Sequence, residues 1–80
     1  MPTIDRPGPY QIFFYSLENG EPPHVHIRRD RATAKVWLAP IAMARWKHFG
    51  DTELNAIMRL VRENRTKYLD EWHGFFGTLP

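Results

Sequence analysis

Between residues 24 and 38 the chain reads HVHIRRDRATAKVWL, a pattern in which polar and apolar side chains alternate. In its first half the apolar residues are Val25 and Ile27, and the polar residues around them are His24, His26 and Arg28. This two-residue period is typical of a half-buried strand, because successive side chains point to opposite faces. The pattern therefore places two imidazoles and a guanidinium in a row on the polar face of a strand.

The rest of this stretch predicts a second strand that runs back along the first. Residues 29–31 are polar and are expected to form a turn, and in Ala32–Leu38 apolar residues again alternate. Upstream, residues 10–16 read YQIFFYS, and such aromatic and β-branched residues favour a strand. Asn19 and Gly20 tolerate positive φ and are expected to reverse the chain between these strands. The sequence thus predicts a three-stranded antiparallel meander.

Prolines mark the segments on either side of the predicted sheet. Residues 1–9 contain three prolines, which lack an N–H and fix their backbone, so a Pro-rich N-terminal arm is expected there. Pro40 is expected to end the third strand, and residues 41–49 are expected to form a connector. Residues 78–80 are expected to form a C-terminal tail.

After the connector the apolar residues change to a helical period. Gly50 and Asp51 favour a helix start, and apolar residues then recur at helical spacing. These residues are Leu54, Ile57, Met58, Val61, Tyr68, Leu69, Trp72, Phe75 and Phe76. The sequence predicts one long helix, or two nearly collinear helices that break near Asn64, with a stop at Gly74 or Gly77. The fold class is therefore α+β, with the helical stripe packed on one face of the sheet.

Length and composition restrict the domain organisation and the chemistry. The 80 residues are expected to form one small domain, 1–80, because separate cores require roughly 250 residues or more. The chain has no cysteine, so disulfides, thiolate metal sites and thiol nucleophiles are excluded. No uncharged run reaches the ~18 to 20 residues of a membrane span, and residues 1–5 lack a signal-peptide pattern. A cytoplasmic protein without a membrane partner is expected.

Basic residues are concentrated in one short segment. The formal net charge is only +2, yet four cations gather between residues 28 and 35, with Asp30 as the one acidic residue among them. Such a patch can bind phosphates, and Trp37 on the same strand could stack an unpaired base. The predicted nucleic-acid-binding residues are therefore Arg28, Arg29, Arg31, Lys35 and Trp37. A solvated strand face, with Trp37 packed at its edge, is the alternative interpretation.

The predicted catalytic residues are His24 and His26, two histidines at i and i+2 that directly follow Pro22-Pro23. Histidine titrates near neutral pH and exchanges protons with hydroxyl groups, while neighbouring cations stabilise a phosphate without a metal. This combination is what a metal-independent ribonuclease requires. Alternatively, both histidines are structural and hydrogen-bond the adjacent turn or the C-terminal helix.

A His-x-His pair on a strand can also supply two ligands to a metal ion. Zinc needs a third or fourth ligand, which His73, Asp70, His48 or Glu21 would have to provide. Spacing selects none of these four, so the sequence predicts neither a complete metal site nor a cofactor. For His73, beside the predicted helix end, a favourable interaction with the helix C-terminus is the simpler explanation.

Several motifs resemble the bacterial domain-of-unknown-function family 4160, and together they span nearly the whole chain. They are Met1-Pro2-Thr3-Ile4, Phe14-Tyr15, Pro22-Pro23-His24-Val25-His26-Ile27, Ala34-Lys35-Val36-Trp37-Leu38-Ala39-Pro40, Glu63-Asn64-Arg65 and Trp72-His73-Gly74-Phe75-Phe76-Gly77. Members of this family are often encoded beside another small domain, in pairs that look like toxin–antitoxin modules. The resemblance implies a small cognate protein partner and favours a ribonuclease toxin, without assigning a catalytic residue.

Two functional hypotheses of different classes follow. In the first, the protein belongs to a toxin–antitoxin-like pair and acts on RNA, which requires an open face around His24 and His26. In the second, it is a non-enzymatic, antitoxin-like interaction module whose histidines pack against the C-terminal helix. Metal binding through the two histidines is the third hypothesis. The residues leave open whether the protein is an enzyme, and the thin core makes a homodimer through the sheet edges reasonable.

Overall fold

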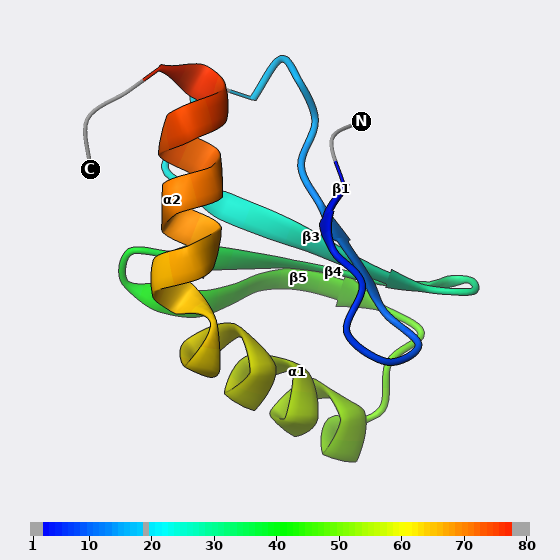
Figure 1. Ribbon diagram of the computed structural model, residues 1–80. Helices are drawn as coiled ribbons and strands as arrows, with labels where there is room; N and C mark the ends of the chain where they lie inside the picture. Colours follow the sequence, from blue (N-terminus) through cyan, green and yellow to red (C-terminus); the bar gives the residue numbers. More distant parts are fainter. Residues whose placement is uncertain (1–2, 19, 78–80) are drawn as a thin grey trace.

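The computed structural model describes residues 3–18 and 20–77, and these form a five-stranded antiparallel sheet followed by two helices (Figure 1). The strands lie in chain order, and the elements are β1 (Thr3–Asp5), β2 (Gln11–Phe13), β3 (His24–Arg29), β4 (Ala32–Leu38), β5 (Ile41–Lys47), α1 (Asp51–Glu63) and α2 (Arg65–Phe76). The predicted α+β class and the central meander are confirmed. The predicted count of three strands is wrong, because the sheet has a further strand at each edge.

The first additional strand, β1, lies inside the predicted N-terminal arm. Among the described residues it pairs with β2 alone, with Thr3 opposite Phe13, so one of its edges carries ladder hydrogen bonds there. The prolines that argued against a strand stand outside β1, and Pro7 accepts a backbone hydrogen bond from Tyr10 in the turn that follows. Residues 1–2 of the arm, Asn19 of the predicted reversal and the predicted tail 78–80 lie outside the described residues.

The second additional strand, β5, replaces the predicted connector. Its sequence, IAMARWK, contains alanine, methionine and long charged residues, which have little intrinsic preference for strands. It nevertheless pairs with β4 from Leu38 opposite Ile41 to Thr33 opposite Lys47. Pro40 therefore lies in the tight turn between two strands instead of ending the sheet. Pairing with a neighbouring strand decided the conformation of this segment against its local propensity.

The core lies between one face of the sheet and both helices. Its buried residues come from alternate positions of β2, β3 and β4, from the apolar stripe of the helices and from Phe49 between β5 and α1. They are Ile12, Val25, Ile27, Ala32, Ala34, Val36, Leu38, Phe49, Ile57, Val61 and Tyr68. The predicted alternation on β3 and β4 and the packing of the helices on one face are confirmed.

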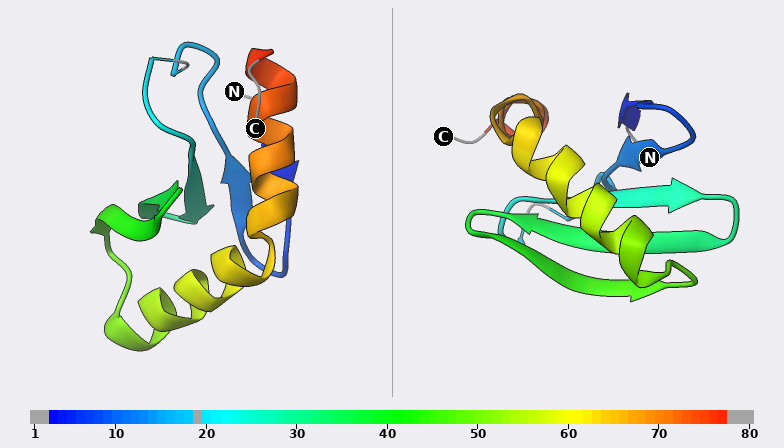
Figure 2. Two further views of the ribbon diagram at one scale, coloured as in Figure 1. Left: turned by 90° about the vertical axis from the view of Figure 1, so that its left-hand side faces the viewer. Right: turned by 90° about the horizontal axis from the view of Figure 1, so that it is seen from below.

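The two helices meet at a sharp corner, so the prediction of collinear helices is wrong (Figures 1 and 2). Asn64 forms the corner: its backbone N–H reaches the carbonyls of Leu60 and Val61, and its side-chain amide donates to Leu60 at 2.9 Å. Arg65 then donates to the Leu38 carbonyl at 2.7 Å, which fixes the start of α2 against the end of β4. The break at Asn64 is one of the two alternatives that the sequence left open, and its direction depends on these contacts.

The second helix ends at Gly77, which adopts the left-handed conformation at φ 66°. Of the two predicted stop residues Gly77 is therefore correct, whereas Gly74 lies inside α2. Trp72, Phe75 and Phe76 of this helix surround Phe14, and their ring centroids lie 5.1–5.3 Å from it. This aromatic cluster holds the chain after β2 against α2. Neither described helix has the length and apolar run that crossing a bilayer would require.

Candidate functional site

The two histidines of the predicted catalytic pair meet on the polar face of β3. Their ring centroids are 5.1 Å apart and the ring planes are nearly perpendicular, at 86°. Both side chains are enclosed, since His24 is 0% exposed and His26 is 8% exposed. The row of polar residues on β3 is therefore formed as predicted, but its histidines lie beneath other side chains.

A third side chain, Glu18, reaches both histidines from the loop after β2. Its Oε2 atom lies 2.9 Å from Nε2 of His24 and 3.0 Å from Nε2 of His26. The backbone N–H of Tyr15 donates to the other carboxylate oxygen, Oε1, at 2.7 Å. Phe14, at the start of this loop, is fixed against α2. The turn from Tyr15 to Glu18 that follows therefore places the Glu18 carboxylate beside the start of β3.

The environment decides which of these groups is charged. Burial alone would raise the pKa of Glu18, but hydrogen bonds with the Tyr15 N–H and His26 outweigh it and hold the pKa below its usual value. Burial lowers the pKa of His26, and the nearby Glu18 carboxylate opposes that shift only partly. At neutral pH the cluster therefore presents an ionised carboxylate beside a neutral His26 imidazole.

The ring of His24 is oriented by a backbone carbonyl. Its Nδ1 lies 3.0 Å from the carbonyl oxygen of Pro22, which can only accept, so Nδ1 carries a hydrogen. The other ring nitrogen, Nε2, is buried and has no hydrogen bond among the described residues. Its 2.9 Å contact with Glu18 is an approach of two atoms without hydrogen-bond geometry. The buried Nε2 of His24 therefore faces the Glu18 carboxylate without a hydrogen bond to it.

Aromatic rings cover the cluster on both sides. Phe13 stacks on His26 at a centroid distance of 5.4 Å, and Tyr15 meets the same ring edge-on at 4.9 Å. Trp37 and Trp72 lie 5.4 and 4.8 Å from the ring of His24. These contacts restrict both rings to one orientation and keep most water out, which strengthens every electrostatic interaction inside the cluster.

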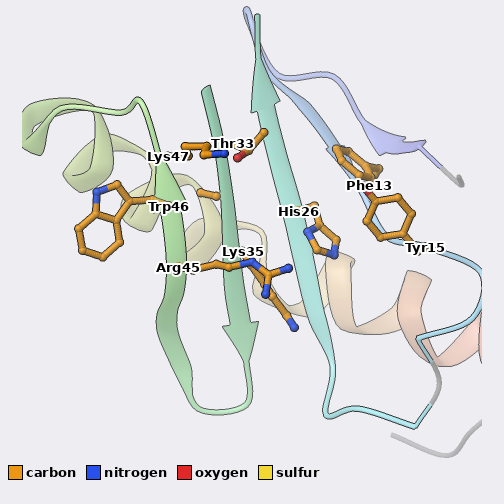
Figure 3. Close-up of a pocket in the computed structure, with 9 residues that line it drawn as sticks. Phe13, Tyr15, His26, Thr33, Lys35, Arg45, Trp46 and Lys47 are labelled. Carbon is orange, nitrogen blue, oxygen red and sulfur yellow. The ribbon is translucent and has the colours of Figure 1, made fainter. Parts of the chain in front are cut away.

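A depression of about 310 Å³ lies on the same face of the sheet, next to His26 (Figure 3). We call it the basic groove, and it is lined by Phe13, Tyr15, His26, Thr33, Ala34, Lys35, Arg45, Trp46 and Lys47. Its lining includes three cations and no aspartate or glutamate. Trp46 is 55% exposed, an unusual state for the largest apolar side chain, and projects from β5 at the margin away from Phe13.

Three of the five predicted nucleic-acid-binding residues lie close to these features, and two of them, Lys35 and Trp37, are on β4. Lys35 lines the basic groove, where its Nζ pairs with Glu21 at 2.6 Å and lies 4.6 Å from the ring centroid of Trp37. Trp37 itself packs on His24 and is outside the groove lining. The indole that the structure exposes beside the cations is Trp46.

The three arginines of the predicted set have different surroundings. Arg28 is exposed near the groove, donates to Gln11 at 2.6 Å and lies over the ring of Phe13. Arg29 forms a two-pronged ion pair with Glu53 of α1, with contacts of 2.6 and 2.8 Å. Arg31 is exposed in the turn between β3 and β4. Arg28 and Lys35 therefore lie near the groove, whereas Arg29 is held in an ion pair with α1.

Sequence reasoning missed two parts of this site. Glu18 lies six residues before His24 across a turn, and no periodicity connects the two positions. The group of three metal-ligating side chains found among the described residues contains Glu18, and the four third-ligand candidates from the sequence are not part of it. Arg45 and Lys47 were missed because β5 was expected to be a connector, although the sequence shows both cations next to Trp46.

The fold and the site define a small α+β protein with a carboxylate–imidazole cluster beside a basic sheet face. Residues 10–73 match the family model described as "Domain of unknown function (DUF4160)", and the chain belongs to this family. The resemblance seen in the sequence motifs is therefore confirmed. Neither a curated protein nor a solved structure matches the chain.

Proposed function

We propose that the protein binds single-stranded RNA along the basic groove. The observation that carries this proposal is the composition of the groove lining, in which the exposed cations Arg45 and Lys47 stand beside an exposed indole, while the third cation, Lys35, is 6% exposed and paired with Glu21. Cations that follow a shallow surface neutralise successive phosphates, and aromatic faces stack unpaired bases. The cations and Tyr15 line the groove, and the Trp46 indole extends from the β5 edge next to them.

The exposed aromatic rings favour RNA over an acidic protein segment as the ligand. Trp46 is 55% exposed and Tyr15 is 48% exposed; Tyr15 borders the groove on the β2 side, and Trp46 extends outward from β5 at the opposite margin (Figure 3). An acidic peptide would need only the cations, whereas splayed bases need flat apolar faces at the margin. Arg28, exposed beside Phe13, extends the positive surface toward β2.

The proposed function is binding without cleavage by the histidine pair. A general base has to come within about 2.6 to 3.2 Å of the proton that it removes. His24 is fully buried under Trp37 and Trp72, and the Nε2 of His26 is directed at Glu18 instead of the groove. This geometry supports the non-enzymatic hypothesis, in which the histidines are packed against the C-terminal helix. In a toxin–antitoxin-like pair, such a module would bind RNA or carry the cognate protein.

The experiment measures binding of a labelled single-stranded RNA by fluorescence anisotropy at several salt concentrations. The test variant is Arg45→Gln/Lys47→Gln, and the control is Arg59→Gln/Arg62→Gln on the exposed surface of α1, which removes the same charge. We expect the groove variant to weaken binding at least tenfold and to reduce the slope of log K against log salt by about 1.4, because each phosphate contact contributes about 0.7. The α1 variant should bind like the wild type.

Three outcomes would contradict the proposal. The first is absence of RNA binding by the wild type at low salt, and the second is an equal loss in the two charge variants. In the third, an acidic peptide competes as well as RNA does and Trp46→Ala leaves RNA binding unchanged, which would indicate a protein ligand. Gel analysis of the RNA in the same samples detects cleavage, and cleavage that disappears in His26→Ala would support the ribonuclease hypothesis instead.

A further inference from the structure

Independently of RNA binding, we propose that Glu18, His24 and His26 bind a divalent first-row transition metal ion such as zinc. Each of these residues offers one ligand atom, and the three atoms lie within 4.8 Å of one another. Zinc is held at about 2.0 to 2.2 Å from its nitrogen and oxygen ligands, so neighbouring ligand atoms in a tetrahedral site are about 3.3 Å apart. The contacts of 2.9 and 3.0 Å between Glu18 and the two rings are close to that spacing.

The unbonded nitrogen of His24 is the observation that points to a cation. When the Nδ1 of His24 carries the hydrogen given to Pro22, the lone pair of the neutral ring is on Nε2. This lone pair faces the Glu18 carboxylate at 2.9 Å, and two acceptors at that distance repel each other. A shared proton would require hydrogen-bond geometry, which the contact lacks. A metal ion between the three atoms would accept a lone pair from each of them once the hydrogen of His26 moves from Nε2, where it bonds Glu18, to Nδ1.

The surrounding groups have the arrangement that metal ligands usually require. A histidine ligand commonly donates its other ring N–H to a carbonyl, and His24 does so to Pro22. The Glu18 carboxylate is in turn oriented by the Tyr15 N–H at 2.7 Å. The rings of Phe13, Trp37 and Trp72 form an apolar shell around the imidazoles. The His24 ring and the Glu18 carboxylate are therefore already oriented by backbone groups of Pro22 and Tyr15.

The ligand types select the class of ion. Two imidazole nitrogens with one carboxylate oxygen suit zinc and neighbouring transition metals, whereas magnesium and calcium prefer oxygen ligands alone. The single carboxylate leaves a local charge of +1 with a divalent ion, and the adjacent Lys35 is neutralised by Glu21. Three protein ligands leave one position of a tetrahedron for water or another non-protein ligand.

The first experiment uses the wild-type protein without a polyhistidine tag, stripped by a chelator and then titrated with zinc. We expect one zinc ion per chain by calorimetry, and a rise in Tm with zinc that EDTA reverses, since a ligand of the native state stabilises it. Cobalt, added in place of zinc, should give visible absorption bands of a four-coordinate site. Failure of micromolar zinc to bind or to change Tm would overturn the proposal.

Two variants test whether zinc binds at this cluster. Glu18→Gln keeps the size of the side chain but removes its charge, and we expect it to weaken zinc binding at least tenfold. His48→Asn is the control, because His48 is exposed outside the cluster and asparagine tolerates its φ of 66°. The proposal fails if Glu18→Gln binds zinc as tightly as the wild type.

A measurement on the wild type keeps the test independent of how the variants fold. We expect zinc to shift the ring Nε2 resonances of His24 and His26 and to leave those of His48 and His73 unchanged. Shifts confined to the latter two residues would place any bound zinc elsewhere and would overturn the assignment.

Discussion

The Tyr68 hydroxyl of α2 donates a hydrogen bond of 2.9 Å to the Asp5 carboxylate of β1, and this bond joins residues that are 63 positions apart. Tyr68 is fully buried in the core, and Lys67 places its Nζ 3.4 Å from the same oxygen of Asp5. The edge strand β1 has no strand partner other than β2 among the described residues. The Tyr68–Asp5 bond therefore fastens the N-terminal edge of the sheet to the C-terminal helix.

We expect Tyr68→Phe to lower the free energy of unfolding by about 1 to 2 kcal/mol, because the variant keeps the ring but loses a hydrogen bond to a charged acceptor. Urea denaturation of both proteins measures the difference. Tyr15→Phe, at a half-exposed position, should change stability by less than about 0.5 kcal/mol. Equal effects of the two substitutions would show that the Asp5 contact does not stabilise the fold.

The same bond predicts a dependence on pH. Burial alone would raise the pKa of Asp5, but hydrogen bonds with Tyr68, the Arg6 N–H and Lys67 outweigh it and hold the pKa below its usual value. In the unfolded chain Asp5 titrates at about 3.9, so the stabilisation is complete above that pH and is lost as pH falls through the lower folded pKa.

The stability difference between wild type and Tyr68→Phe should therefore be constant from about pH 5 to 8 and shrink below about pH 4. Urea denaturation at each pH gives this difference. Using the difference removes the contributions of the other carboxylates, which titrate in both proteins. A difference that grows on acidification would contradict the assignment of the bond to the ionised form of Asp5.

Two glycines of α2 should respond to alanine with opposite signs. Gly74 lies inside the helix and an added Cβ would meet nothing within 4 Å, so Gly74→Ala should stabilise by about 0.5 to 1 kcal/mol. Gly77 has φ 66°, and there alanine should cost about 1 to 2 kcal/mol because its Cβ crowds the backbone. Thermal melts of both variants test this, and stabilisation by Gly77→Ala would refute the left-handed cap.

Truncation of the core should be costly in so small a protein. Ile57 is fully buried where α1 meets the sheet, and Ile57→Ala should cost about 2 to 4 kcal/mol through lost burial and the cavity that remains. The control is Leu17→Ala, because Leu17 is 93% exposed in the loop after β2 and its truncation should cost less than about 0.5 kcal/mol. Similar losses in the two variants would place Ile57 outside the stabilising core.

Local periodicity was sufficient to predict the centre of the fold. Alternation along His24–Leu38 predicted the paired strands β3 and β4 with His24 and His26 on one face, and a spacing of three and four predicted the helices. The break near Asn64 and the stop at Gly77 were each one of two alternatives given by the sequence, because both rest on the conformational preferences of single residues. In all these cases the signal is contained within one element of the chain.

Only the tertiary structure decided the features that join distant segments. β5 became a strand because β4 offered an unpaired edge, although its sequence has little preference for strands, and β1 became one because β2 did, although prolines surround it. Glu18 joined the histidines because Phe14 is anchored on α2 and the turn that follows is closed by Tyr15. The composition along the chain determined which side chains are available. Contacts between segments far apart in sequence decided which of them meet, since pairing and burial depend on neighbours that no local pattern specifies.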